Sequence, residues 1–245
     1  MLSTREAAQR LGVSEASVRR WSDTGRLPVK RTGKRRERRF AAEHVDGLAG
    51  QLRAAPLASP SLSSPKRLVL AGQVLEVPFH LPAFYDTDAG RTRLTVPFLA
   101  DGLRAGQPCF LVAQGEELDA YLVALDAQPG VDVDQALASG ALTVVGAPGR
   151  TVAEALEFWE TNLWAALDRH VTLMRAVGEM VSERMTFESE REMLAYEVAF
   201  NMTGRRFPAA VICQYDVRKF SGKALLAALR AHPDILGISL SPLIK

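Results

Sequence analysis

Residues 3–21 read STREAAQRLGVSEASVRRW, and this stretch decides the organisation of the N-terminal part of the chain. Ser3 and Glu6 have the spacing of a capping box, in which two side chains bond backbone amides at a helix start. Gly12 favours the left-handed conformation that ends a helix, and Ser14 is a good cap for the next helix. The stretch therefore predicts two short helices joined by a tight turn.

The second predicted helix has an apolar face and a polar face. Val18 and Trp21 lie three residues apart, so they share a face that we expect to be buried. Arg19 and Arg20 then point outward, with Ser17 near the exposed edge. This predicts a helix that packs on one side and presents arginines on the other.

A basic segment follows, in which residues 29–40 read VKRTGKRRERRF. It predicts two basic strands with a hairpin tip at residues 32–34, and Phe40 packing back on the helices. A third helix is predicted over Ala42–Arg53, with Val45, Leu48 and Leu52 at helical spacing. This order of elements is typical of a winged helix-turn-helix and predicts that the chain binds double-stranded DNA.

Charge is divided unevenly along the chain. Residues 1–55 hold 13 Lys/Arg and 6 Asp/Glu, whereas the other residues hold 17 and 22. A basic patch on one small module indicates phosphate binding, and an acidic body is not expected to bind nucleic acid. We therefore predict a DNA-binding domain at 1–53, an Ala/Ser/Pro-rich linker at 54–67 and a second domain at 68–245.

The N-terminal domain resembles the MerR-type winged helix-turn-helix, in particular its short excisionase-like variety. The resemblance rests on AAQRLGVS at 7–14, SVRRW at 17–21, GRLP at 25–28 and RRF at 38–40. It implies that the second helix enters the major groove while the wing holds the flanking backbone. The DNA-binding residues implied are Ser17, Arg19, Arg20, Lys30, Arg31, Lys34, Arg35, Arg38 and Arg39.

One departure from the longer MerR-type regulators bears on assembly. Those proteins dimerise through a long coiled coil, which needs several heptads of apolar positions. Here the third predicted helix stops near Arg53 and prolines begin at Pro56. We therefore expect a homodimer formed through the C-terminal domain. No apolar run approaches the length of a membrane span, and two cysteines are too few for a disulfide framework, so we expect a cytoplasmic protein without a membrane partner.

From residue 68 onward, apolar runs alternate with helical patterns, which predicts an α/β domain with a mostly parallel sheet. The predicted strands are Leu75–Phe84, Cys109–Ala113, Leu142–Val145, Thr172–Val177, Ala210–Tyr215 and Ile235–Leu240. The predicted helices are Thr92–Ala105, Glu116–Ala127, Thr151–Arg169, Glu188–Thr203 and Gly222–Ala231.

Ligands in such sheets bind beyond the carboxyl ends of the strands, so polar residues there are candidates for a site. Glu179 and Asp216 follow apolar strands, and Glu197 lies on a helix that can reach them. We expect one pocket for a small ligand, with tyrosines as its apolar wall. Its predicted residues are His80, Tyr85, Arg175, Glu179, Tyr196, Glu197, Tyr215 and Asp216. The alternative is a purely structural role, in which these polar groups pair with one another inside the core.

The C-terminal domain resembles the MEDS sensory domain, a family named for methanogens, methylotrophs and the dichloromethane-responsive repressor. The resemblance covers about residues 75–240. Its motifs are His80 and Tyr85, FLADGLRAGQPC at 98–109, RAVGEM at 175–180, Tyr196-Glu197 with Asn201, CQYD at 213–216 and His232-Pro233. It implies a RecA-like or KaiC-like α/β core that senses small organic compounds.

Two other functions stay open. A RecA-like nucleotide switch or ATPase tethered to DNA would need a P-loop, but in YDTDAGRT at 85–92 only Gly90 and Thr92 fit. A thiol or metal sensor would use Cys109 and Cys213, with His80 and His232 as further soft ligands assembled across the fold. No closely spaced ligand set or catalytic constellation is present, so we assign no metal ligand and no catalytic residue. The cofactor is left open, and we predict a non-enzymatic, ligand-responsive transcription regulator.

Overall fold

The computed structural model describes residues 1–11, 15–23, 27–33, 37–54, 66–167, 171–232 and 234. Contacts between Cα atoms divide the chain into two compact units, Met1–Ser64 and Pro65–Lys245, and each is described by itself. The division falls inside the segment where the linker was predicted. None of the helices in the described ranges is long and apolar enough to cross a membrane.

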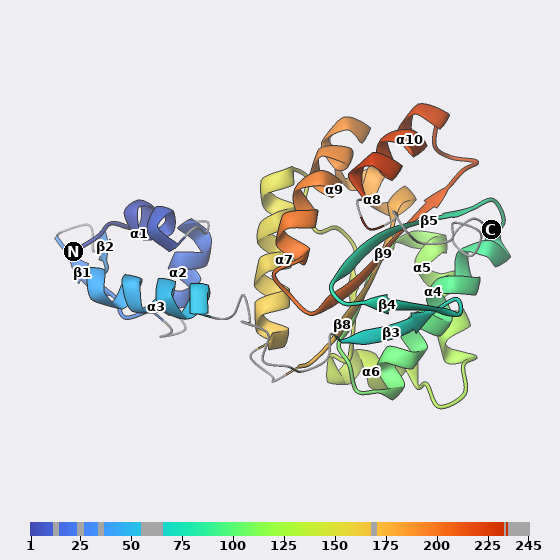
Figure 1. The fold of residues 1–245 in the computed structure, drawn as a ribbon, viewed down its shortest axis with the longest axis horizontal. Coiled ribbons are helices and arrows are strands. Elements are labelled where there is room, and N and C mark those ends of the chain that lie inside the picture. Colours follow the sequence, from blue (N-terminus) through green and yellow to red (C-terminus); the bar gives the residue numbers. More distant parts are fainter. Residues whose placement is uncertain are drawn as a thin grey trace. The chain divides into compact units, whose positions relative to one another are not determined.

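The N-terminal unit has the predicted order of helix, helix, hairpin and helix (Figure 1). Its elements are α1 (Thr4–Leu11), α2 (Glu15–Asp23), β1 (Lys30–Thr32), β2 (Glu37–Arg39) and α3 (Ala42–Ala54). Strands β1 and β2 pair antiparallel, with Lys30 opposite Arg39 and Arg31 opposite Arg38. The winged helix-turn-helix architecture is thus confirmed.

The start and the core of this unit follow the sequence pattern. The Ser3 amide donates to Glu6 Oε2 at 2.8 Å, and the Glu6 amide donates to Ser3 Oγ at 3.3 Å, which completes the capping box. Trp21 is 3% exposed and packs in one core with Val18 and Phe40, both fully buried. Because Trp21 is buried, the apolar face of α2 is the packing face.

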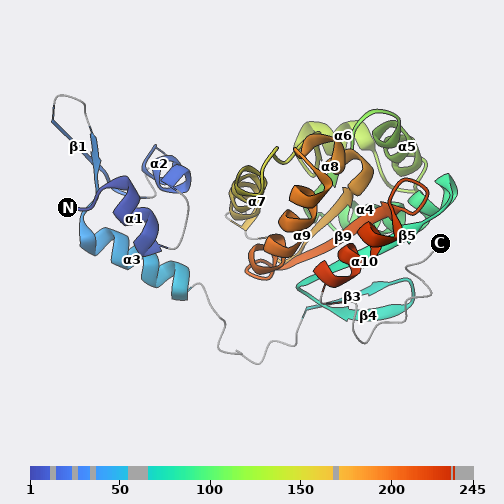
Figure 2. The ribbon, with the colours of Figure 1, turned by 90° about the horizontal axis from the view of Figure 1, so that it is seen from above.

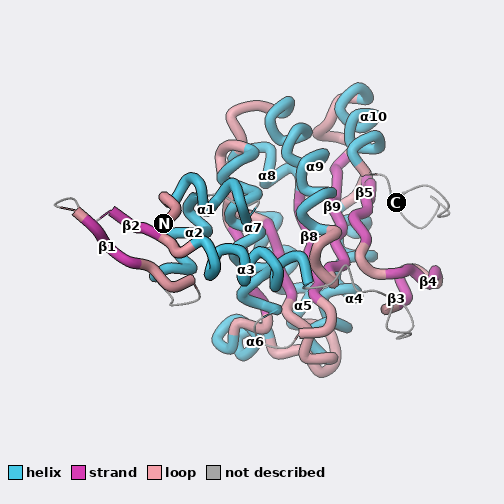
Figure 3. The backbone as a smooth tube through the Cα atoms, turned by 60° about the vertical axis from the view of Figure 1, so that its left-hand side comes forward, coloured by secondary structure: helices cyan, strands magenta, loops and turns pink. Residues whose placement is uncertain are grey.

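The C-terminal unit contains a five-stranded parallel sheet and a separate two-stranded hairpin (Figures 1 and 2). The sheet has the order β5-β9-β8-β6-β7, and its strands run side by side between helices (Figure 3). The strands are β3 (Arg67–Leu70), β4 (Gln73–Glu76), β5 (Phe79–Tyr85), β6 (Cys109–Val112), β7 (Leu142–Val145), β8 (Met174–Glu179) and β9 (Ala209–Asp216). The helices are α4 (Asp88–Arg104), α5 (Gly115–Asp126), α6 (Val133–Ser139), α7 (Val152–Leu167), α8 (Met180–Thr186), α9 (Glu190–Gly204) and α10 (Gly222–Ala231).

Each face of the sheet has its own hydrophobic core, because side chains alternate along a strand. On one face, Phe110, Val211 and Tyr215 pack with α7, α8, α9 and α10. On the other face, Leu111 and Ile212 pack with α4, α5, α6 and the β3–β4 hairpin. We call these the α9 face and the α4 face. The unit is an α/β domain with a parallel sheet flanked by helices, as predicted.

Some predicted boundaries were wrong. The strand predicted over Leu75–Phe84 is two strands, β4 and β5, because Pro78 between them has no N–H to continue a ladder. The strand predicted over Thr172–Val177 runs instead from Met174 to Glu179. Helix α4 begins at Asp88, four residues before the predicted start, since Thr87 caps it by accepting from the Gly90 amide at 3.1 Å.

Other elements were not predicted at all. Strand β3 and the short helices α6 and α8 are absent from the predicted elements. The helices α5, α7, α9 and α10 and the strands β6, β7 and β9 lie within two residues of the predicted bounds wherever those bounds are described. The strand predicted over Ile235–Leu240 lies outside the described residues.

Candidate functional site

The N-terminal unit presents exposed basic residues on α2 and the hairpin, and also Arg5 and Arg10 on α1. Arg19 is exposed and pairs with Glu15 one turn earlier at 2.9 Å. Lys30 and Arg31 on β1 are also exposed. Between the helices and the hairpin lies a hollow of about 440 Å³, lined by Ser3, Thr4, Arg5, Glu15, Arg19, Glu37, Arg38 and Arg39. The side chains of Ser17 and Arg20, and residues Lys34 and Arg35, lie outside the described part of this unit.

Arg38 on the hairpin bonds to α2. Its guanidinium donates to the Arg19 carbonyl oxygen and to Ser22 Oγ, both at 2.7 Å. Arg39 pairs with Glu37 at 2.8 Å. Arg38 therefore fixes the hairpin against α2. The exposed basic residues of α2 and those of the hairpin are thus held in a fixed arrangement.

In the C-terminal unit, the predicted ligand residues are divided between the two faces of the sheet. Those on the α9 face are His80, Tyr196, Glu197 and Tyr215, and those on the α4 face are Tyr85, Arg175, Glu179 and Asp216. The structure therefore does not place all eight around one site. The strand ends do place Tyr85 beside Asp216, and Glu179 beside Gln214, at one edge of the sheet.

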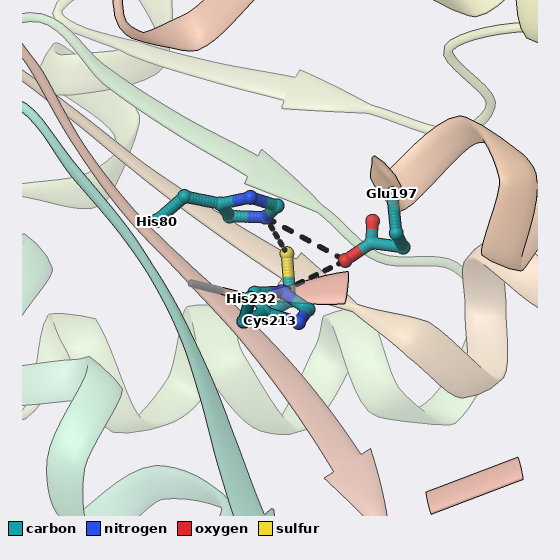
Figure 4. A group of neighbouring side chains, drawn as sticks. All are labelled: His80, Glu197, Cys213 and His232. Atoms are coloured by element: carbon teal, nitrogen blue, oxygen red, sulfur yellow. Dashed lines mark hydrogen bonds and ion pairs between the residues drawn. The ribbon is translucent and has the colours of Figure 1, made fainter. Parts of the chain in front are cut away.

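Four buried side chains meet on the α9 face, and we call them the histidine–cysteine cluster: His80, Glu197, Cys213 and His232 (Figure 4). They come from β5, α9, β9 and the C-cap of α10, and none is more than 4% exposed. The ring Nε2 of His80 lies 3.0 Å from Cys213 Sγ and 3.5 Å from Glu197 Oε2. The ring Nε2 of His232 lies 2.9 Å from the same Glu197 oxygen.

The electrostatics of this cluster centre on Glu197. Burial opposes its ionisation, but His232 and His80 hold the pKa of this carboxyl below its usual value. Burial and the neighbouring His232 lower the pKa of His80, which favours a neutral ring. Burial, with help from Glu197 and Glu183, raises the pKa of the Cys213 thiol. The resulting donor set of two imidazoles, a carboxylate and a thiol is one that binds late first-row divalent metals.

A second polar group lies on the α4 face around Glu179, which is fully buried. The Tyr85 hydroxyl donates to Glu179 Oε1 at 2.9 Å, and the Tyr121 hydroxyl donates to Glu179 Oε2 at 3.3 Å. Tyr121 also donates to Gln214 Oε1, and the Arg91 guanidinium lies 5.7 Å from the centre of the Tyr85 ring. These groups form a buried polar cluster around the carboxyl group at the end of β8, with a hydroxyl group beside each oxygen.

The free energy of unfolding should depend on pH through the titration of Glu179. Burial raises the pKa of this carboxyl to about 7 from its ordinary 4.5, despite opposing hydrogen bonds from Tyr85 and the charge of Arg91. Between pH 4.5 and 7 the folded protein binds this proton more tightly than the unfolded chain. The free energy of unfolding therefore falls as pH rises through that window, by about 2–3 kcal/mol from this group.

Glu179→Gln removes this titration, so urea unfolding of the wild type and the variant at pH 5 and pH 8 checks the prediction. We expect the wild type to lose more stability than the variant between the two pH values. Glu188→Gln, at an exposed carboxylate, is the control and should follow the wild type. Parallel pH profiles for the wild type and Glu179→Gln would contradict the assignment.

The remaining predicted residues have local partners. Although burial opposes it, Arg218 holds the pKa of Asp216 below its usual value, and the same guanidinium bonds Asp88 at 2.9 Å. Asp88 lies in the first turn of α4, where a P-loop would bind phosphate. A carboxylate there repels phosphate, which does not favour the nucleotide-switch alternative. Tyr196 stacks on Phe187, with ring centres 5.2 Å apart, inside the apolar core.

Arg175 lies at the start of β8, away from Glu179. It donates to the Phe98 carbonyl oxygen at 2.7 Å and to Gln107 Oε1 at 2.8 Å. Burial raises the pKa of the neighbouring Cys109 to about 12, which fits an inert core thiol. Arg175 therefore does not join the predicted pocket residues Glu179, Glu197 and Asp216.

Sequence reasoning considered Cys213 and His232 only for an alternative thiol or metal sensor, and it did not assign Tyr121 or Asn201 to a site. A signal was available in the period-two alternation of the strands. Cys213 has the parity of Tyr215 on β9 and His80 has the parity of Phe84 on β5, which sends both to the α9 face. His232 follows a helix on that face, and only the packing of α10 brings its ring to Glu197.

Comparisons with known proteins extend over both units. Residues 79–233 match the family described as MEDS, the MEthanogen/methylotroph, DcmR Sensory domain. Residues 1–51 match the family described as a helix-turn-helix domain. The chain is 37% identical over 241 residues to the transcriptional repressor DcmR of Methylorubrum extorquens (strain DSM 6343 / CIP 106787 / DM4). That alignment covers 96% of this chain and 90% of the relative.

Proposed function

The chain belongs to the family of helix-turn-helix regulators with a MEDS sensory domain, and we propose that it is a repressor released by a small organic ligand. The observation that carries this proposal is the alignment with a transcriptional repressor through 96% of the chain, so that both units are included. The N-terminal unit binds DNA and the C-terminal unit senses. A closer likeness to MerR-type domains stays a prediction.

The structure supports a specific role for each part of the N-terminal unit. Helix α2 buries Val18 and Trp21 and leaves Arg19 exposed, which suits a helix that reads the major groove. The exposed Lys30 and Arg31 on β1 suit phosphate contacts, which position the protein without specifying sequence. Arg38 holds these two surfaces together through Arg19 and Ser22.

A Lys30→Ala/Arg31→Ala double variant should weaken binding to all DNA sequences alike. Each phosphate contact contributes about 0.9 to the slope of log affinity against log salt, so losing two should lower that slope by about 2. Fluorescence anisotropy over a salt series, with the selected site and a scrambled duplex, measures both slopes. Lys223→Ala, an exposed position in the C-terminal unit, is the control. A drop confined to the selected site would instead make these residues base contacts.

For the sensory unit, we place the small ligand at the sheet edge where Tyr85, Glu179 and Asp216 end their strands. Parallel sheets bind ligands at this edge, and buried Glu179 with two tyrosine hydroxyls offers the few polar groups that fix a small molecule. A homodimer through the C-terminal unit is the further part of the proposal. Support comes from exposed Val198 and Met202, four residues apart on α9.

A reporter experiment tests the proposal. A binding site is first selected from random duplexes with the purified full chain and then placed across a reporter promoter. Expression of the chain should lower reporter output, and a panel of small alcohols, amines, halides and carboxylic acids should contain compounds that restore it. Higher output on expression would contradict repression. Release that is unchanged in Tyr85→Phe and Glu179→Gln would move the ligand away from this edge.

A further inference from the structure

We propose that the histidine–cysteine cluster is a metal site, in which His80, Glu197, Cys213 and His232 bind one Zn²⁺ tetrahedrally. The proposal concerns the C-terminal unit alone and does not depend on DNA binding or on the organic ligand. It revises the interpretation of the sequence, which assigned no metal ligand. Three observations carry it: the spacing of the ligand atoms, the directions of the ring hydrogen bonds, and the burial of all four side chains.

The spacing fits a tetrahedron around one ion. One ligand atom from each side chain lies within 4.8 Å of the other three. Around Zn²⁺, with bonds of about 2.0–2.3 Å, tetrahedral ligand atoms lie about 3.3–3.6 Å apart. The three close pairs of the cluster, at 2.9, 3.0 and 3.5 Å, are near these values. The other pairs lie within 4.8 Å, so the side chains would have to move closer by up to about 1.2 Å to close the coordination shell.

The hydrogen bonds of His80 leave its Nε2 lone pair turned toward the centre. The Asn201 amide nitrogen donates to the carbonyl oxygens of Glu197, at 3.3 Å, and of Ala231. The amide oxygen of Asn201 therefore faces His80 Nδ1, at 2.8 Å, and accepts a hydrogen bond from the Nδ1–H group. A neutral His80 has no second N–H, so its Nε2 is an acceptor, which takes the hydrogen bond of the Cys213 thiol at 3.0 Å when no metal is bound.

His232 is held in the same way by different partners. Its Nδ1 lies 2.7 Å from the Ala228 carbonyl oxygen, which can only accept, so Nδ1 carries the proton. Its Nε2 is buried and makes no hydrogen bond of acceptable geometry, although Glu197 Oε2 is 2.9 Å away. Two acceptors at that distance repel unless a positive charge lies between them. A cation bound by both atoms removes the repulsion.

The surroundings of the rings match those of metal-binding histidines. Such histidines donate the other ring N–H to a carbonyl, carboxylate or similar acceptor, which fixes the tautomer. Asn201 Oδ1 and the Ala228 carbonyl oxygen take that role here. The Tyr215 hydroxyl in turn donates to Glu197 Oε2 at 3.2 Å. The cluster therefore has both a set of ligands and the second layer of bonds that orients them.

The donor set and its burial select Zn²⁺ over harder ions. Imidazole and thiolate ligands favour late first-row metals, and Mg²⁺ or Ca²⁺ prefer oxygen ligands. Four protein ligands in an interior position make a closed site, which is the structural rather than the catalytic arrangement of zinc. Because the ligands come from β5, α9, β9 and the end of α10, the ion would tie these elements together. A proton on His232 is the competing occupant.

The test uses full-length, tag-free protein with Zn²⁺ and Co²⁺ as probes. After chelation and dialysis, the wild type should bind one Zn²⁺ per chain by mass spectrometry of metals. Co²⁺ should give visible bands of tetrahedral intensity and an ultraviolet thiolate-to-cobalt band. Cys213→Ser should lose the ultraviolet band and weaken Zn²⁺ binding about 100-fold or more. Cys109→Ser, at the other buried cysteine, should keep both.

A second pair of measurements keeps the test decisive if Cys213→Ser folds poorly. Asn201→Ala leaves the four ligands in place and should weaken Zn²⁺ binding about 10–100-fold. Free Zn²⁺ at 100 times its Kd should raise the Tm of the wild type by about 5–10 °C. A wild type that binds no Zn²⁺ and shows no Tm shift would overturn the proposal. Cobalt bands lost with Cys109→Ser but kept with Cys213→Ser would overturn it as well.

Discussion

An Arg19→Ala/Arg20→Ala double variant is expected to bind its selected DNA site about 100-fold or more weakly than the wild type. Each arginine that contacts a base edge contributes about 1–3 kcal/mol, and both residues lie on α2, whose buried face is formed by Val18 and Trp21. The Arg19 side chain makes an exposed pair with Glu15, and such pairs contribute little to stability. The variant should therefore lose affinity without losing its fold.

Anisotropy with the selected duplex and a scrambled duplex checks this expectation, and the melting curve of the variant checks its fold. Lys223→Ala/Arg230→Ala, at two exposed positions on α10, removes the same charge from the other unit and is the matched control. Specific affinity should fall much more than affinity for the scrambled duplex. Equal losses for the two duplexes would show that α2 contacts phosphates only, and unchanged binding would defeat its assignment as the recognition helix.

The N-terminal fold could be predicted closely because its signals are local. The capping box of Ser3 and Glu6, the inward pair Val18 and Trp21, and the run of basic residues before Phe40 each act within a few residues. Local side-chain and backbone preferences decide such elements before any tertiary contact forms. The structure gives Ser3, Glu6, Val18, Trp21 and Phe40 the predicted places.

The sheet was predicted from runs of apolar residues. The wrong strand boundaries arise from contacts between residues that are far apart in the sequence, which such runs do not reveal. Strand β8 extends to Glu179 because Tyr85 and Tyr121, distant in sequence, supply hydroxyl donors for a buried carboxyl. A polar residue in that position otherwise indicates the end of a strand. Helix α8 begins directly after Glu179, so the sequence has no loop that would separate it from the strand.

Most residues of the candidate sites could be predicted from the sequence, but not which of them lie together. His80, Glu197 and Glu179 were all predicted, yet they lie on two faces of the sheet because neighbouring strand positions point in opposite directions. Parity within β5 and β9 separates His80 from Tyr85, and Cys213 from Asp216. The position of His232 depends on how α10 docks, which alternation along the strands does not determine.

Glu197→Leu is expected to lower the free energy of unfolding by about 3–5 kcal/mol, because it leaves several buried polar groups without their shared partner. Glu197 is 1% exposed and is the shared partner of His232, His80 and the Tyr215 hydroxyl, so leucine would leave three buried polar groups without it. Leucine fits the volume, and the loss would therefore report on the polar contacts.

Glu197→Gln separates charge from hydrogen bonding at the same position. Nδ1 of His232 donates to Ala228, so its Nε2 can accept from the new amide, while the amide oxygen can still accept from Tyr215. This variant should lose much less stability than Glu197→Leu. Urea unfolding with a chelator present measures both without any contribution from metal, and Glu188→Leu at an exposed carboxylate is the control. Equal losses for leucine and glutamine would mean that the negative charge itself holds His80 and His232 in place.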